Sequence, residues 1–326
     1  MIFEEVPTLS NLDRFLHATT PVSTSSFLPK SKMKTLNPLW HPWEREKVEY
    51  LVLSDLWKAY DEWSAYGAGV PITLQNGETL IQYYVPYLSA LQIYTTSSCL
   101  RGLREEAEFG DATLSDMFSE ESDGDKTCRW DASSSDENGS EVDNPYPLNN
   151  KLGHLYFQHF ECSTPYGRVP LVDKVNSLAQ SYPGLMSLRS VDLSPASWMA
   201  VAWYPIYHIP VGRTIKELSA CFLTYHTLSS SFQDMEADDD LEKPVRKRRE
   251  GEGIALGPFG LATYKMQGKL WESGNNGLDE SRLSSLLSVA DSWLKQLRVH
   301  HPDFDYFVGL RRGFVPHPSL SLSLCR

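Results

Sequence analysis

Hydrophobic residues fill both alternating sets of positions in the segment 194–227, which holds the longest uncharged apolar run of the chain. At a period of two, the even positions from Trp198 to Tyr204 form one apolar face, and the odd positions from Met199 to Trp203 form the other. This pattern is typical of a strand that is covered on both sides. A second strand over 218–228 is expected to return beside it. A competing interpretation, a short buried helix over 195–204 capped by Ser194, stays open.

Other periodic segments predict the rest of the core. Apolar residues at helical spacing predict helices over 44–63, 172–182 and 283–297, and a short amphipathic piece follows Ser10. Aromatic and β-branched runs predict a strand over 81–96 that is broken at Pro86, a strand that begins at His154 and includes His159 and Cys162, and a last strand within 260–271. Residues 19–34 are too polar for a core element and are expected to form a surface loop. About three helices and five or six strands imply an α+β fold with a mainly antiparallel sheet.

Two polar inserts interrupt this pattern. The segments 105–150 and 233–253 are rich in charged and small polar residues, and both are expected to be disordered. We therefore expect residues 1–40 to form a short helix and loop, residues 41–312 a single α+β domain that carries both inserts, and residues 313–326 a flexible tail.

Charge is concentrated in the first insert. The chain has 326 residues and a net charge of −12, and the segment 105–143, with 14 acidic and 2 basic residues, carries all of that excess. The remainder is close to neutral and lacks the broad basic face that binds phosphate backbones, so we do not expect direct nucleic-acid binding. No stretch approaches the roughly 18 continuous apolar residues of a membrane span, and no secretion signal is recognised. The five cysteines form no CxxC pair, which favours reduced thiols.

Several long motifs point to a known family. They are SNLDRFL, LSDLWKAYDEWSAYGAGVP, QYYVPYLSALQIYT, HLYFQHFECSTPYGRVPLVDKV, SWMAVAWYPIYHIPVGRT and ACFLTYHTL. Together they resemble the plant family catalogued as domain of unknown function 789, and they span nearly the whole chain outside the inserts. The resemblance implies no activity and supplies no catalytic residues to transfer. The C-terminal RRGFVPHPSLSLSLCR is where a departure from the family pattern is expected.

Metal and catalytic chemistry find little support in the residue patterns. His159 with Cys162, and Cys221 with His226, could form a zinc site, but offsets of three and five place each pair on opposite faces of its strand. We therefore expect no metal and no cofactor. The chain has no nucleophile elbow and no phosphate-binding loop.

Three acidic residues of the expected core have simpler explanations than catalysis. We interpret Glu161 as a strand-end charge, Asp173 as a helix cap and Asp192 as a turn residue. An enzyme remains the alternative, because active sites join residues that are distant in sequence.

An aromatic cluster is the best candidate for a pocket. The residues are Trp198, Trp203, Tyr204, Tyr207 and His208. Aromatic side chains at alternating strand positions are more often part of a core than ligand contacts, so a buried core remains the alternative to a ligand pocket.

Short linear motifs are dense in the polar segments. A basic run that resembles a nuclear-import signal contains Lys243, Arg246, Lys247, Arg248 and Arg249; the alternative is a solvated loop neutralised by the acidic residues 238–240. Ser122, Ser133 and Ser134 each have an acidic residue three positions later, as acidophilic kinases prefer. The tail sequence 320–324, LSLSL, resembles a corepressor-recruiting motif; its alternative is a frayed end.

These features favour a non-enzymatic regulatory domain that binds other proteins, with an import receptor and a corepressor as candidate partners. We expect it in both the nucleus and the cytoplasm. The alternative is an enzyme or small-ligand binder with a cleft beside 198–208.

Overall fold

The computed structural model describes residues 9–33, 36–41, 47–101, 103, 152–206, 218–232, 253–266, 268–271 and 278–311. The predicted insert 105–150, all but the last residue of 233–253, and the tail 313–326 lie outside the described residues.

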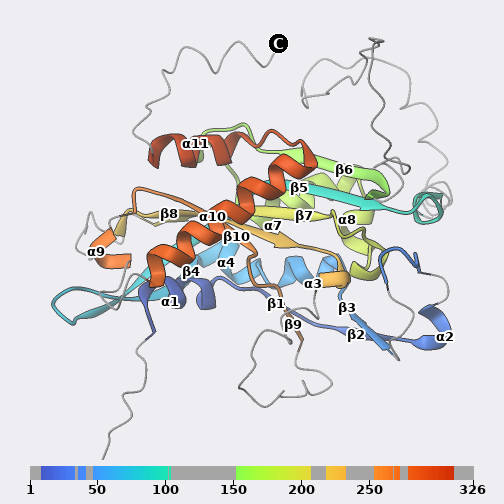
Figure 1. Ribbon diagram of the computed structural model, residues 1–326, viewed down its shortest axis with the longest axis horizontal. Helices are drawn as coiled ribbons and strands as arrows, with labels where there is room; N and C mark the ends of the chain where they lie inside the picture. The colour runs from blue at the N-terminus through green and yellow to red at the C-terminus, as the bar shows by residue number, and fades with distance from the viewer. Residues whose placement is uncertain are drawn as a thin grey trace, which may run out of the picture.

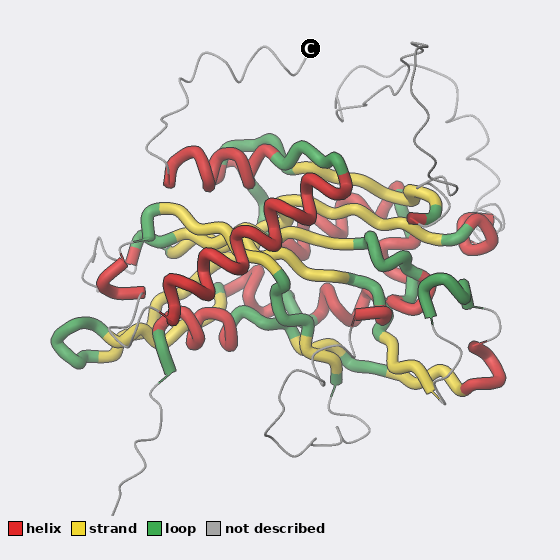
Figure 2. The backbone as a smooth tube through the Cα atoms, in the orientation of Figure 1, coloured by secondary structure: helices red, strands yellow, loops and turns green. Residues whose placement is uncertain are grey.

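A six-stranded antiparallel sheet forms the centre of the protein (Figures 1 and 2). Its order is β10-β8-β7-β5-β4, and β6 pairs with β5 as well. The strands are β4 (Ala68–Thr73), β5 (Thr79–Thr95), β6 (His154–Phe160), β7 (Trp198–Pro205), β8 (Cys221–Thr227) and β10 (Gly260–Tyr264). The predicted α+β class with a mainly antiparallel sheet is confirmed, and so are the strand over 198–204 and its return partner.

Helices cover both faces of this sheet. In Figure 1, α10 (Leu278–Leu297) crosses the front of the sheet and α11 (Pro302–Arg311) lies beside it. The other face is packed by α1 (Asn11–Ala18), α3 (Leu53–Lys58), α4 (Asp61–Tyr66), α7 (Leu171–Ser181) and α8 (Gly184–Ser187). Strand β7 separates the two cores, because Trp198, Ala200 and Ala202 join the α10/α11 side. Met199, Val201 and Trp203 join the opposite side. The predicted two-sided burial of this strand is therefore confirmed.

Two short sheets extend the fold. Strand β1 (Val22–Ser23) pairs with β9 (Ile254–Ala255), and β2 (Ser26–Pro29) pairs with β3 (Lys47–Tyr50). The remaining short elements are α2 (Lys30–Met33), α9 (Gly268–Trp271) and the 3-10 turns η1 (Pro165–Gly167), η2 (Ser190–Asp192) and η4 (Ser230–Phe232). The surface loop predicted over 19–34 is thus wrong in part, because Leu28 and Met33 are buried in a small core of their own.

Two further predictions need correction. The helix predicted over 44–63 begins only at Leu53, because Val48 lies in β3 and packs into the small core beneath it. The strand predicted to break at Pro86 continues through it. Pairing of β5 with β4 ends at Tyr84 and pairing with β6 begins at Ala90, so among the described strands β5 has a neighbour at Pro86 on one side only. A residue without an N–H is tolerated at such a position.

Candidate functional site

A buried polar network joins the sheet to the start of α11. Ser89 donates a hydrogen bond to Asp303 Oδ2 (2.5 Å), and His301 Nε2 lies 2.9 Å from Ser89 Oγ. His301 Nδ1 lies 2.8 Å from the Tyr225 hydroxyl, and Arg168 donates to both carboxylate oxygens of Asp303 at 2.6 and 2.7 Å. All five side chains are almost completely buried.

A β-bulge places Ser89 in this network. The register of β5 against β7 shifts between Leu88 and Ala90, so Ser89 is an extra residue in β5. Leu88 packs on the α1 side of the sheet, whereas Ala90 packs on the α10/α11 side. The bulge therefore turns Ser89 and Ala90 toward the same face.

Ser89, His301 and Asp303 are the residue types of a hydrolase triad, but their arrangement is different. In a triad the carboxylate orients the histidine and the histidine takes the serine proton. Here Ser89 contacts both other residues, and Tyr225 contacts the second ring nitrogen of His301. With a neutral His301 the bonds run in one direction, from the Tyr225 hydroxyl to Nδ1, from Nε2–H to Ser89, and from Ser89 to Asp303. Ser89 is fully buried, so the network ties elements together and offers no nucleophile to a substrate.

Burial determines the protonation states in the network. It lowers the pKa of His301 to about 4, while the charge of Asp303 acts in the opposite direction. It also raises the pKa of Tyr225 well above its ordinary value. Both groups are therefore neutral at pH 7, as the directed chain of hydrogen bonds requires.

Arg168 also builds the exposed loop that follows β6. Its guanidinium donates twice to the Ser163 carbonyl (2.9 Å each), and the Ser163 N–H donates to Glu161 Oε1 (2.9 Å). Burial would raise the pKa of Glu161, but contacts with His159, Ser163 and Lys174 outweigh it and hold the pKa below its ordinary range. At the tip of this braced loop, Tyr166 is fully exposed.

Four tyrosines surround Arg168, and we call Tyr87, Tyr166, Tyr204 and Tyr306 the tyrosine surface. The rings of Tyr87 and Tyr204 are 5.7 Å apart, and the Arg168 guanidinium lies 5.8 Å from the Tyr204 ring. Burial raises the pKa of Tyr306, and the nearby Tyr166 adds to that shift; burial likewise raises the pKa of Tyr204, to which the nearby Tyr306 contributes. On the same face of β5, Tyr83 and Ile81 remain exposed. Tyr166 and Tyr306 are the well exposed members of the tyrosine surface, whereas the Tyr204 hydroxyl is buried and the Arg168 side chain is buried and paired with Asp303.

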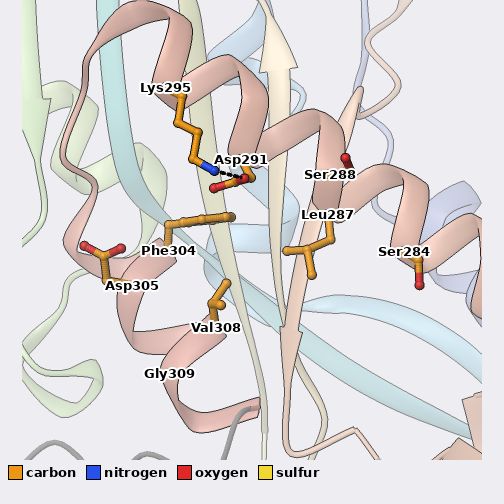
Figure 3. Close-up of a pocket in the computed structure, with 9 residues that line it drawn as sticks. All are labelled: Ser284, Leu287, Ser288, Asp291, Lys295, Phe304, Asp305, Val308 and Gly309. Carbon is orange, nitrogen blue, oxygen red and sulfur yellow. Dashed lines mark hydrogen bonds and ion pairs between the residues drawn. The ribbon is translucent and has the colours of Figure 1, made fainter.

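A groove of about 630 Å³ separates α10 from α11 (Figure 3). Leu287, Phe304 and Val308 lie between the two helices in this view. The other lining residues are Ser284, Ser288, Asp291, Lys295, Asp305 and Gly309. Lys295 pairs with Asp291 at 2.5 Å within its own helix, so these charges already have partners.

The described residues of the predicted aromatic pocket do not share one face of the sheet, because Trp203 lies opposite Trp198 and Tyr204. Trp198 and Trp203 are fully buried on opposite faces of β7, and their indole N–H groups donate to Gln92 and Thr224. Tyr204 is the one described member that reaches the tyrosine surface. Tyr207 and His208 lie outside the described residues.

The predicted linear motifs also lie outside the described residues. They are the basic run with Lys243 and Arg246, Lys247, Arg248 and Arg249, the serines Ser122, Ser133 and Ser134, and the leucines of the tail.

The candidate zinc residues have other roles. Cys221 packs against α11, whereas His226 contacts the Leu256 carbonyl and Thr224 from within β8. In the part of the chain that the structure describes, no three His, Cys, Asp or Glu residues are grouped to hold a metal. No described helix is both long and apolar enough to cross a bilayer.

Sequence reasoning missed every member of the Ser89 network. The members lie up to 214 residues apart, and the bulge that brings Ser89 to them leaves no mark in the periodicity of β5.

Comparison with known proteins gives one family. A family model described as a protein of unknown function, DUF789, matches residues 10–307. No curated protein and no solved structure gives a significant match. The matched range includes the Ser89 network and the tyrosine surface, and the chain belongs to the DUF789 family.

Proposed function

We propose that this protein is a non-enzymatic interaction domain that binds another protein through the tyrosine surface. The observation that carries the proposal is Tyr166, a fully exposed aromatic side chain on a loop braced by a buried ion pair. Tyrosine is among the residues that dominate binding energy at protein interfaces. A rigid loop loses little conformational entropy on binding, so its side chain is pre-organised for a partner.

The neighbouring side chains support the same proposal. Tyr306 and Val169 are partly exposed beside the loop, and Tyr83 and Ile81 extend the apolar area along β5. Arg168 is paired with Asp303, so a partner would meet tyrosine rings and hydroxyls rather than a free charge. Such a surface suits a partner with an apolar, weakly charged face.

Site-specific photo-crosslinking tests this proposal. A photoreactive phenylalanine analogue replaces Tyr166 in the full chain, and the control carries it at Tyr66, which is also strongly exposed but lies on α4. In cells that express the protein, position 166 should give a discrete crosslinked product that Tyr306→Ala removes. Identical products from positions 166 and 66, or a product that is insensitive to Tyr306→Ala, would refute the tyrosine surface as the contact.

We further propose that the protein is divided between nucleus and cytoplasm. The support is the basic run with Lys243 and 246–249, close in sequence to the acidic residues 238–240, whose opposite charge would partly mask it. Replacing 246–249 by alanine should shift a large fluorescent fusion toward the cytoplasm. Replacing 238–240 by asparagine should shift it toward the nucleus. An unchanged distribution in the alanine variant would leave the run as a solvated loop.

A further inference from the structure

The α10–α11 groove has the size and lining of a peptide-binding site. Its volume of about 630 Å³ lies within the range of roughly 300–1,000 Å³ typical of ligand sites. Leu287 and Val308 are only partly buried and supply apolar contacts, Phe304 is 7% exposed at the floor of the contact, and the small residues Ser284, Ser288 and Gly309 leave the groove open.

A segment of the same chain begins next to this groove. Helix α11 ends at Arg311, two residues after the groove residue Gly309, and residues 312–326 follow. Fifteen residues reach up to about 50 Å when extended. The groove runs along α10 from Ser284 to Lys295, which is about 16 Å at the helical rise per residue. The segment is therefore long enough to turn back and fill it.

The composition of this segment matches the groove. In an extended conformation, side chains alternate between two faces, so Leu320, Leu322 and Leu324 would share one apolar face. Arg312 and Arg326 flank the apolar residues. Asp305 at the groove lies 3.0 Å from His300 Nε2, and because its side chain is 61% exposed its carboxylate can also accept from an arginine.

We propose that residues 313–326 bind in the α10–α11 groove of their own chain, with the three leucines packed over Leu287, Phe304 and Val308. In this state the leucine motif is covered, so a protein that recognises it must compete with the groove. The inference does not depend on the tyrosine surface, because Tyr306 packs against Tyr264 and Phe307 and is not a groove residue.

Crosslinking in the full chain tests the proposal, because the segment carries a native thiol, Cys325. Ser288→Cys places a second thiol in the groove, and Ser284→Cys is an independent second position. The matched control is Ser285→Cys, an exposed position on the same helix that does not line the groove. A short bismaleimide joins nearby thiols, and mass spectrometry of the monomer band identifies peptides linked to Cys325.

The groove variants should link to Cys325 several times faster than the control. Replacing Leu320, Leu322 and Leu324 together by serine should remove that preference. Equal rates for the groove positions and Ser285→Cys, or a preference that survives the leucine replacements, would overturn the proposal. Thermal melting checks that each variant is folded. If Ser288→Cys is not folded, the comparison of Ser284→Cys with Ser285→Cys tests the proposal.

Discussion

Arg168 and Asp303 form a bidentate ion pair across 135 residues of sequence, with side chains only 4% and 7% exposed. The pair fastens the Tyr166 loop to the start of α11, and Ser89 adds a hydrogen bond to the same carboxylate. Removing one partner of such a pair leaves the other charge buried without compensation.

We therefore predict that Arg168→Ala lowers the free energy of unfolding by about 3–5 kcal/mol. Arg189→Ala is the matched control, because Arg189 also pairs with an aspartate, Asp192 at 2.7 Å, but is 39% exposed. It should cost at most about 1 kcal/mol. Urea unfolding of the two variants gives the comparison, and similar losses would show that burial does not strengthen the Arg168 pair.

Asn11 gives a second prediction about stability. Its side-chain amide donates to the carbonyls of Thr73 (2.9 Å) and Leu270 (2.8 Å), and its oxygen accepts from the Thr73 N–H (2.9 Å). It thus pairs with the end of β4 as a neighbouring strand would. Asn11→Ala should cost about 2–4 kcal/mol, because three partly or fully buried backbone groups lose their partners. Ser10→Ala removes only the helix cap and should cost about 1 kcal/mol. A smaller loss for Asn11→Ala than for Ser10→Ala in thermal melting would contradict this role.

Two buried histidines predict a loss of stability in mild acid. Burial lowers the pKa of both His301 and His226 to about 4, against about 6.5 in the unfolded chain. A depressed pKa contributes stability that is present above pH 6.5 and is lost as the pH falls toward 4, because only the unfolded chain then binds the protons. When the pH falls from 7 to 5, each histidine should lower the free energy of unfolding by about 2 kcal/mol.

Urea unfolding at both pH values measures this effect. Replacing His301 by Gln should reduce the pH dependence by about half while lowering stability at pH 7. An unchanged slope would mean that His301 titrates normally in the folded protein. The low pKa of Glu161 adds a further loss only below about pH 4.5, outside this window.

Gly260 predicts a coupled effect between β10 and α10. A Cβ atom added at Gly260 would lie 2.9 Å from the Cβ atom of Ala290, closer than van der Waals contact allows. Gly260→Ala should therefore cost about 1–3 kcal/mol. Adding Ala290→Gly should recover part of that loss, although Ala290→Gly alone destabilises the helix by about 1 kcal/mol. If the double-mutant cycle gives no coupling free energy between positions 260 and 290, α10 moves away from the added methyl group without a cost in stability.

Local periodicity was enough to predict the layered core. The helices over 171–181 and 278–297 follow the predicted stripes, and β7 shows the predicted two-sided burial. Trp293 lies in the predicted stripe of α10 and packs on Phe259 at 5.0 Å, although it is only partly buried.

The predictions were wrong where contacts with residues distant in sequence override the local pattern. The spacing of Val48 and Leu51 fits a helix, but pairing with β2 draws residues 47–50 into a strand. Proline usually ends a strand because it has no backbone N–H, yet β5 continues through Pro86, since neither β4 nor β6 pairs with β5 at that position. The candidate site depends on the same kind of information, because neither the bulge at Ser89 nor the pairing of Arg168 with Asp303 follows from residues near them in sequence.

The assembly state of the protein in extracts tests the proposed interaction most directly. Size-exclusion chromatography of an extract from cells that express the protein compares the wild type with the Tyr166→Ala, Tyr306→Ala double variant and with Tyr66→Ala. The wild type and Tyr66→Ala should elute together in a fraction larger than the monomer, and the double variant should elute as a folded monomer. Co-elution of all three proteins would contradict an interaction through the tyrosine surface.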